Sequence, residues 1–173
     1  MFSKGELIVY GSSGVYRVDE VGPIDIKGCE DKQYYTMTPV FGTGTSYVPV
    51  DTKVFMRKVM DKARAEDLID RIPDIEESQF NERNPKAIKE HYSASMKSHD
   101  LSEMLSMIKA IYAKGERCRS SNKKLSRIEQ QYMNQAEDLV YGEFAVALGI
   151  PRESVLGYIR ERLSGRENGP AES

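Results

Sequence analysis

Apolar and polar residues alternate in short runs along the first 60 residues, and turn residues rich in glycine separate the runs. Alternation with period two is typical of strands that bury one face. We expect strands in five runs: residues 7–10, 15–21, 24–26, 33–40 and 45–50. Turns are expected at Lys27-Gly28 and at residues 41–44. Five short strands with no helix between them predict a small, strongly bent antiparallel barrel.

The spacing becomes helical after residue 60. Helices are expected over residues 61–72, 86–98, 101–114 and 127–148, and from residue 155 onwards. Capping boxes, with glutamate three residues after the capping side chain, begin at Asp100 and Ser126. Gly115 and Gly149 are expected to end their helices. The predicted fold class is therefore α+β, with an N-terminal antiparallel β barrel followed by a C-terminal all-α helical bundle.

The change of pattern near residue 60 and a polar stretch at residues 74–84 predict the division of the chain. We expect four regions: a β domain over residues 1–60, a connecting helix and linker over 61–83, a helical domain over 84–164 and a disordered tail over 165–173.

Composition is that of an ordinary soluble protein, with 30% charged and 39% hydrophobic residues among 173. The sequence contains no apolar run of membrane-spanning length and no secretory signal, so we expect a cytoplasmic protein without a membrane partner. The two cysteines, Cys29 and Cys118, are far apart and predict neither a disulfide nor a metal site. No cofactor is expected.

Net charge is −2, but the basic residues are unevenly distributed. Residues 84–127 contain ten Lys and Arg against four Asp and Glu, a net charge of +6. A clustered basic face is what a phosphate-binding surface requires. A solvated helix face is the alternative interpretation of the same charges.

No motif indicates catalysis. Residues 42–46 lack the lysine of a phosphate-binding loop and precede a strand, so they predict a hairpin turn. Glu90 and His91 could act as acid and base, but no nucleophile stands at a fixed spacing beside them. We therefore expect no catalytic residue and no small-molecule substrate. A small enzyme that uses Glu90 and His91 is the alternative from another functional class.

Three tyrosines of the β segment, Tyr34, Tyr35 and Tyr47, suit either the core or a partner surface. Alternation places one of each adjacent pair in the core and turns the other outwards. An exposed sheet edge is also a natural docking site for a strand of another protein.

Several short motifs occur along the chain in a fixed order. Those of the β segment are Met1-Phe2, Gly5-Glu6, Ile8-Val9-Tyr10, Gly14-Val15, Ile26-Lys27-Gly28, Gln33-Tyr34-Tyr35 and Val48-Pro49. Those of the helical segment are Leu125-Ser126, Glu129, Ala136, Leu139 and Glu143-Phe144-Ala145. In these motifs and their order, over residues 1 to about 148, the chain resembles the CarD/CdnL family of bacterial transcription regulators, whose N-terminal module also occurs in the transcription-repair coupling factor.

This resemblance implies a Tudor-like barrel that binds the β subunit of RNA polymerase. It also implies a helical domain that contacts promoter DNA at the upstream edge of the transcription bubble and alters open-complex stability. The implied polymerase-contacting residues are Ile24, Asp25, Ile26 and Tyr47. The expected DNA-contacting residues are Pro85, Lys86, Lys89, Arg117, Arg119, Lys123, Lys124 and Arg127.

The sequence departs from the family pattern at several of these places. Many members have arginine where this chain has Ile24 and Tyr47, so the polymerase contact here is expected to be more apolar. Many insert a tryptophan into the minor groove, but this chain has none, and the candidate replacements are Pro85, Phe80 and Tyr92. Gln130 and Gln131 replace basic residues of the last long helix. A polymerase-binding module without DNA contact is the alternative within the same class.

Overall fold

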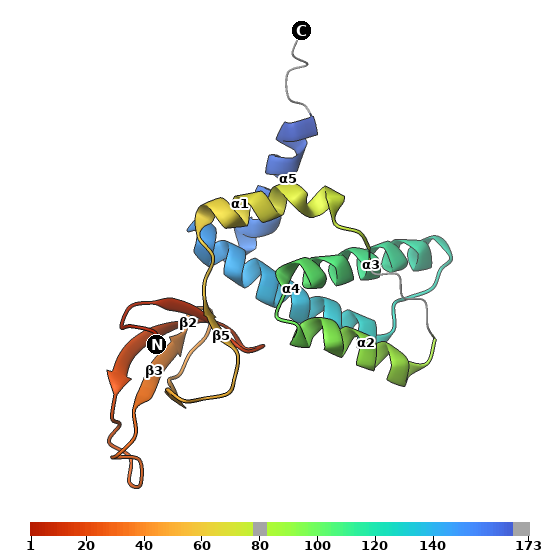
Figure 1. Cartoon of the computed structure of the whole chain (residues 1–173). Helices are drawn as coiled ribbons and strands as arrows, with labels where there is room; N and C mark the ends of the chain where they lie inside the picture. The colour runs from red at the N-terminus through yellow and green to blue at the C-terminus, as the bar shows by residue number, and fades with distance from the viewer. Residues whose placement is uncertain (78–82, 168–173) are drawn as a thin grey trace. The chain divides into compact units, whose positions relative to one another are not determined.

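A computed structural model describes residues 1–77 and 83–167 of the chain (Figure 1). The chain divides into two compact units, one from Met1 to Met60 and one that begins at Asp61. The first unit is built of strands and the second of helices.

One five-stranded antiparallel sheet forms the first unit. Its strands are β1 (Leu7–Tyr10), β2 (Gly14–Gly22), β3 (Tyr34–Pro39), β4 (Ser46–Pro49) and β5 (Met56–Lys58). Their order is β4-β3-β2-β1-β5, and no pairing joins the two outer strands within residues 1–77. The sheet is therefore open, where the sequence predicts a closed barrel, because outer strands of four and three residues offer few hydrogen bonds for closure. The sequence misses β5, since three residues are too few to show an alternation.

The core of this unit lies on one face of the sheet. It is formed by Ile8, Val18, Tyr35, Met37 and Val48, all at most 6% exposed. Tyr35 takes the core position predicted for one tyrosine of the adjacent pair, and its hydroxyl accepts a hydrogen bond from the backbone N–H of Phe2 at 3.2 Å. The neighbouring Tyr34 points to the opposite face and is half-buried.

A β-bulge at Asp19 interrupts the alternation of β2. Val18 and Glu20 pair with consecutive residues of β3, so Asp19 is an extra residue in the ladder. Because one extra residue reverses the side-chain direction, Val18 and Val21 both pack against the core although they are three positions apart. The strict alternation predicted for residues 15–21 is therefore wrong beyond Val18.

The run from Ile24 to Ile26 is not a strand. The pairing of β2 with β3 ends at Gly22, and Pro23 has no N–H to donate to a ladder. The carbonyl of Ile26 instead accepts the N–H of Cys29 at 2.9 Å, which closes a turn around Gly28 with φ of 90°. The predicted turn at Lys27-Gly28 is confirmed.

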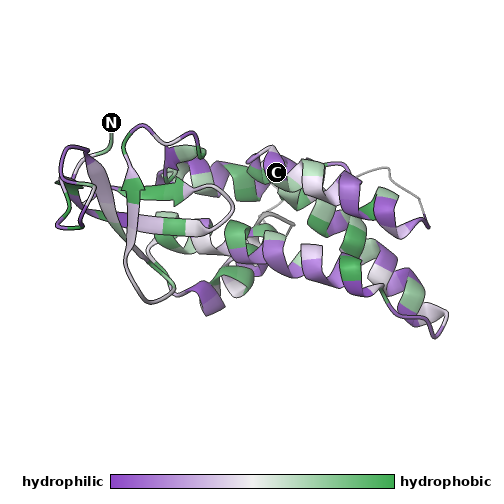
Figure 2. Cartoon of the chain, turned by 90° about the horizontal axis from the view of Figure 1, so that it is seen from below, coloured by the Kyte–Doolittle hydropathy of each residue, from purple (hydrophilic) through white to green (hydrophobic). Residues whose placement is uncertain are grey.

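Within residues 61–77 and 83–167, the second unit contains five α-helices and two short 3₁₀ segments. They are α1 (Lys62–Arg71), η1 (Ile72–Asp74), α2 (Pro85–Lys97), α3 (Leu101–Ser120), α4 (Arg127–Leu148), η2 (Arg152–Ser154) and α5 (Val155–Glu167). The helical part carries both hydrophobic and hydrophilic residues (Figure 2). Across the two described stretches of chain, every helix is too short or too polar to cross a membrane.

The long helix α4 is the centre of this unit. It packs against α1, α2, α3 and α5. Ala136, Val140 and Phe144 are fully buried along its length, four residues apart, so one face of α4 carries the core. Helices α2 and α3 also pack on each other and complete a three-helix arrangement with α4.

The helix ends follow the predicted caps with two exceptions, one at Asp100 and one at Gly115. Ser126 caps α4, and Gly149 ends it in the left-handed conformation with φ of 68°. At the start of α3, the side chain of Asp100 accepts the N–H of Ser102 at 2.7 Å. The N–H of Asp100, however, donates to Oγ of Ser98 rather than to Glu103, so only half of that capping box forms.

Gly115 does not end α3, which continues to Ser120. A Cβ at this position would lie 3.2 Å from Cδ1 of Leu125, so the glycine allows the α3–α4 connection to pack closely against α3. The tail also differs from the prediction, because α5 continues through Gly165 to Glu167. Within α5, Leu156 is 41% exposed.

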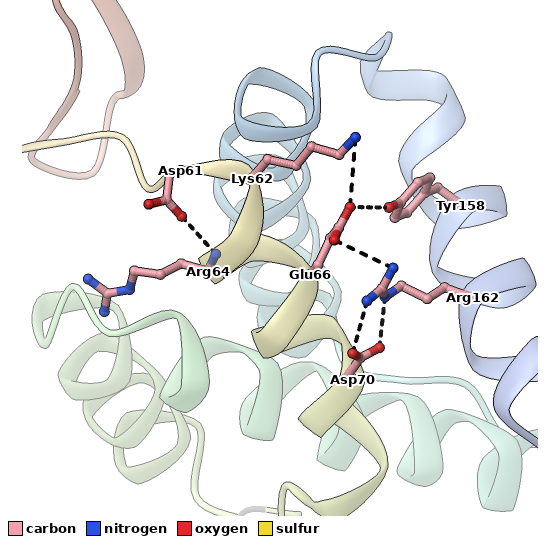
Figure 3. Close-up of polar contacts among 7 residues, drawn as sticks. All are labelled: Asp61, Lys62, Arg64, Glu66, Asp70, Tyr158 and Arg162. Carbon is pink, nitrogen blue, oxygen red and sulfur yellow. Dashed lines mark hydrogen bonds and ion pairs between the residues drawn. The ribbon is translucent and has the colours of Figure 1, made fainter.

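A polar network joins α5 to α1 (Figure 3). The guanidinium of Arg162 donates to both carboxylate oxygens of Asp70, at 2.7 and 3.0 Å, and also lies 3.7 Å from Glu66. The hydroxyl of Tyr158 donates to Glu66 at 3.1 Å. Helix α1, which the sequence assigns to a connecting region, thus packs within the second unit.

Candidate functional site

An open groove of about 910 Å³ lies where α3 ends and α4 begins. Its walls are formed by four basic side chains, two glutamines and the tight α3–α4 connection. The lining residues are Gly115, Arg119, Asn122, Lys123, Lys124, Leu125, Arg127, Gln130 and Gln131. Of the eight expected DNA-contacting residues, the groove therefore brings together Arg119, Lys123, Lys124 and Arg127.

The connection between the helices is a compact turn. The carbonyl of Cys118 accepts the N–H of Lys123 at 2.7 Å, and Asn122 adopts the left-handed conformation with φ of 57°. Asparagine tolerates this conformation better than most residues, so it reverses the chain here without a glycine. The turn places the exposed side chains of Lys123 and Lys124 at the groove.

The described residues that line the groove include no carboxylate. Arg119 forms an ion pair with Glu116, 3.2 Å away, but both side chains are largely exposed, so this pair restrains Arg119 only weakly. Gln130 and Gln131 add hydrogen-bonding groups without charge. The groove is thus a concentrated positive surface that suits an extended polyanion.

A buried glutamate lies between two lining residues, Arg127 and Gln130, in the sequence. Glu129, in the first turn of α4, is 2% exposed. Its Oε1 accepts the hydroxyl of Ser126 at 2.8 Å, and its Oε2 lies 2.8 Å from Nζ of Lys114 on α3. A buried carboxylate is costly unless it is paired, and Lys114 supplies the opposite charge. The capping box is visible in the sequence, but its link to α3 is not.

Two of the ten basic residues counted in the sequence point inwards. Lys114 pairs with Glu129, and Nζ of Lys109 donates to the carbonyls of Ile72 and Ile75 at the end of α1. Neither is a phosphate contact in this arrangement. The net charge of +6 over residues 84–127 therefore overstates the positive charge that a ligand can reach.

The other expected DNA contacts lie outside the groove lining. Pro85, Lys86 and Lys89 are exposed on the first two turns of α2, which begins with Asn84 as its cap. Figure 1 shows the start of α2 at the same end of the three-helix arrangement as the α3–α4 connection. Arg117 is exposed on α3 but does not line the groove.

The candidate wedge residues are not equivalent. Tyr92 is 4% exposed and packs against Tyr132, with ring centroids 5.8 Å apart, so it is a core residue and not a wedge. Burial, and then the charge of Glu129, raises the pKa of Tyr92. Phe80 lies outside the described residues. Pro85, at the first position of α2, is exposed.

The residues expected to contact polymerase all lie in the first unit. Asp25 and Ile26 are exposed in the β2–β3 connection, with 45% of Ile26 accessible, and Ile24 is half-buried. Tyr47 is 50% exposed on β4. The residues expected to contact polymerase therefore lie on a loop and a strand, and not on the two strands that the sequence predicts.

Tyr47 lies on the sheet face opposite the core. It pairs with Thr36, which in turn pairs with Glu20, so the three form a row across β4, β3 and β2. Tyr34 belongs to the same face two residues along β3. The side chain of Cys29, in the β2–β3 connection, hydrogen-bonds the Tyr34 hydroxyl and raises the pKa of Tyr34. The connection that carries Ile26 is thereby linked to the face that carries Tyr47.

Strand β4 is an outer strand of the sheet. Within residues 1–77 it pairs with β3 alone, so its other side presents unpaired backbone groups. An outer strand of this kind can accept a strand from another protein. The exposed Tyr47 would then lie beside the added strand.

Glu90 and His91, the residues of the alternative enzyme interpretation, lie in different surroundings. Neighbouring residues on a helix do not face each other, and Glu90 is exposed whereas His91 is half-buried. The His91 ring packs edge-on against Tyr92, with centroids 5.4 Å apart, and burial lowers the pKa of His91. Across residues 1–77 and 83–167, no group of His, Cys, Asp and Glu side chains could hold a metal ion.

Comparison with known families identifies the first unit. Residues 2–60 match the family model described as the CarD-like/TRCF RID domain. The first unit is a CarD-like domain. The matched residues coincide with the five-stranded sheet, whose boundary falls at Met60. The CarD-like domain marks the chain as an RNA polymerase-interacting, transcription-related protein, and this family is not known as an enzyme family. A comparison with curated proteins found no match.

Proposed function

We propose that this protein is a cytoplasmic transcription regulator. Its CarD-like domain binds the β subunit of RNA polymerase, and its helical unit contacts promoter DNA near the transcription bubble and so modulates open-complex stability. The observation that carries the proposal is the family match over residues 2–60.

The polymerase contact is supported by the exposed residues of the CarD-like domain. Ile26 and Tyr47 present apolar surface on a domain whose core lies on the other face of the sheet. Aromatic and apolar side chains are typical of the centre of a protein interface. The free side of β4 offers backbone hydrogen bonds to a partner strand.

The DNA contact is supported by the basic groove. Its four cations, Arg119, Lys123, Lys124 and Arg127, have no carboxylate among the described lining residues to compete with phosphate. Each phosphate contact of this kind lowers the slope of log affinity against log salt by about 0.9, so four contacts give a slope of about −3.6. Such a slope is shallow, and the contact would show little sequence preference.

Tethering explains how so few contacts could regulate a promoter. Binding of polymerase by one unit holds the other beside the DNA, which raises its effective concentration by orders of magnitude. A weak phosphate contact then suffices to change the lifetime of a complex.

Co-purification tests the polymerase half of this proposal. The full chain, tagged at its C-terminus, should recover RNA polymerase from a bacterial lysate and should bind purified core enzyme in gel filtration. Cross-linking within that complex should map to the β subunit. A chain that binds neither lysate polymerase nor the purified enzyme contradicts the proposal. A chain that binds polymerase but leaves open complexes unchanged supports the module without DNA contact.

A further inference from the structure

The buried Glu129 links three parts of the helical unit. It belongs to α4, its Oε1 binds the last residue of the α3–α4 connection, Ser126, and its Oε2 pairs with Lys114 of α3. The backbone N–H of Glu129 also donates to Oγ of Ser126 at 3.2 Å. Oε2 makes no hydrogen bond within the described chain, so the ion pair with Lys114 is what compensates its charge.

These links are made by residues that are neighbours in sequence of the residues lining the basic groove. Lys123 and Lys124 immediately precede the linked segment, Arg127 follows Ser126, and Arg119 lies on the same helix as Lys114. Leu125, packed 3.2 Å from the position of a Cβ on Gly115, is a second, uncharged link between the connection and α3. The positions of all four groove cations thus depend on how α4 begins against α3.

We propose that Glu129 is a positioning residue for phosphate binding by the groove. Through Ser126 and Lys114 it fixes the start of α4 against α3, and so sets the spacing of the four cations. This inference rests on the proposed DNA contact. It also explains an otherwise costly feature, a buried carboxylate close in sequence to a surface that must attract anions.

A positioning role and a purely electrostatic role of Glu129 predict opposite effects of its removal on phosphate binding. Glu129 is a negative charge close to a phosphate-binding surface, so its removal should tighten phosphate binding if only charge matters. Removal would also release Lys114, which is 36% exposed, as an additional cation. If Glu129 acts by positioning, its removal should weaken binding despite this gain of positive charge.

A pair of variants separates the two effects. Glu129→Ala and Glu116→Ala each remove one glutamate and release one cation, because Glu116 pairs with Arg119 in the exposed part of α3. Binding of the full chain to a fluorescein-labelled mixed-sequence DNA duplex is measured by anisotropy at low salt. We expect Glu129→Ala to weaken binding by about fivefold and Glu116→Ala to tighten it by about twofold, the range of one exposed charge contact.

The conservative variant Glu129→Gln separates the positioning role from a purely structural one. Glu129→Gln keeps an acceptor for Ser126 but loses the charge that pairs with Lys114, so its affinity should lie between those of the parent and Glu129→Ala. If Glu129→Ala binds as tightly as the parent, or tightens binding as Glu116→Ala does, the positioning role is refuted.

The proposed DNA contact is tested in the same assay. Replacement of Lys123, Lys124 and Arg127 together by alanine should abolish most of the binding. If this triple variant binds like the parent, the groove is not a phosphate site and the proposed DNA contact fails with it. A weakened triple variant beside an unaffected Glu129→Ala refutes the positioning role alone.

A second variant keeps the test decisive if Glu129→Ala loses its helical circular dichroism. Leu125→Ala changes no charge and loosens the packing of the connection on Gly115. We expect about fivefold weaker DNA binding with unchanged helix content, again the scale of one displaced charge contact. Affinity equal to that of the parent would show that the cations do not depend on the connection, and would overturn the proposal.

Discussion

The hydroxyl of Thr38 on β3 donates a hydrogen bond to the carboxylate of Asp19, the extra residue of the bulge in β2. Arg17 approaches the same carboxylate, with Nε 2.8 Å from Oδ1. A bulge leaves its extra residue outside the ladder, and here the side chain takes over the link between β2 and β3. These contacts, with the Thr38 hydrogen bond the larger cause, lower the pKa of Asp19 below its ordinary value.

The CarD-like domain should therefore lose stability in acid through Asp19. A group whose pKa is lower in the folded state stabilises the fold above its unfolded pKa, about 3.9 for aspartate, and ceases to do so as pH falls through its folded pKa. Asp19→Asn should lower the free energy of unfolding by about 0.5–1 kcal/mol at pH 7 and pH 5, because the carboxylate is partly exposed. The difference between parent and variant should begin to shrink below about pH 4 and should vanish below the folded pKa of Asp19. Urea unfolding followed by tyrosine fluorescence measures both curves, and a constant difference down to pH 3 would contradict the assignment.

Ile26 is expected to lie at the polymerase contact. Replacement by glutamate places a charge at the centre of an apolar interface, so Ile26→Glu should abolish co-purification with polymerase. The fold should survive because the side chain is already 45% exposed.

Val54 of the same domain provides the matched control. It is also 45% exposed but lies in the segment between β4 and β5, beside the β1–β2 turn. Val54→Glu should therefore retain polymerase in the same pull-down. Equal binding by a folded Ile26→Glu protein, or equal loss by both variants, would rule out Ile26 as the specific contact.

Alanine variants of Tyr92 and Pro85 should differ in stability, because the first residue is buried in the helical unit and the second is exposed. Tyr92→Ala removes a buried aromatic side chain and should lower the free energy of unfolding by about 3 kcal/mol. Pro85→Ala changes an exposed position and should leave it within about 0.5 kcal/mol. Urea unfolding monitored by helical circular dichroism distinguishes them. A Tyr92→Ala protein as stable as the parent would contradict its place in the core and return it to the candidate DNA contacts.

The sequence predicts those features of the fold that depend on residues close together in the chain. The switch from strands to helices near residue 60 follows from the change of hydrophobic period, and Ser126 and Gly149 mark the ends of α4 because their cap chemistry is local. The basic groove is visible as charge in the sequence. Its members are not, since Arg117 and Arg119 are only two residues apart on α3 and only Arg119 lines the groove.

The predictions from sequence are wrong where the structure depends on a residue that is distant in the chain. Gly115 is a helix terminator by type, but its role is to admit Leu125, ten residues further along the chain. The bulge at Asp19 depends on the register with β3, which no alternation within β2 reveals. Lys109 and Lys114 count as surface cations in the sequence, and only the fold shows that the η1 segment and α4 supply their partners.

The lifetime of promoter open complexes tests the central claim most directly. Purified polymerase and promoter DNA are combined with the parent chain, with the Lys123, Lys124 and Arg127 triple alanine variant, or with a control in which three exposed basic residues outside the groove lining, Arg64, Lys97 and Arg160, are replaced by alanine. We predict that parent and control change the lifetime equally, and that the triple variant loses most of this effect across a salt series while it still co-purifies with polymerase. A triple variant that acts like the parent at every salt concentration would contradict the account and leave a polymerase-binding module without DNA contact.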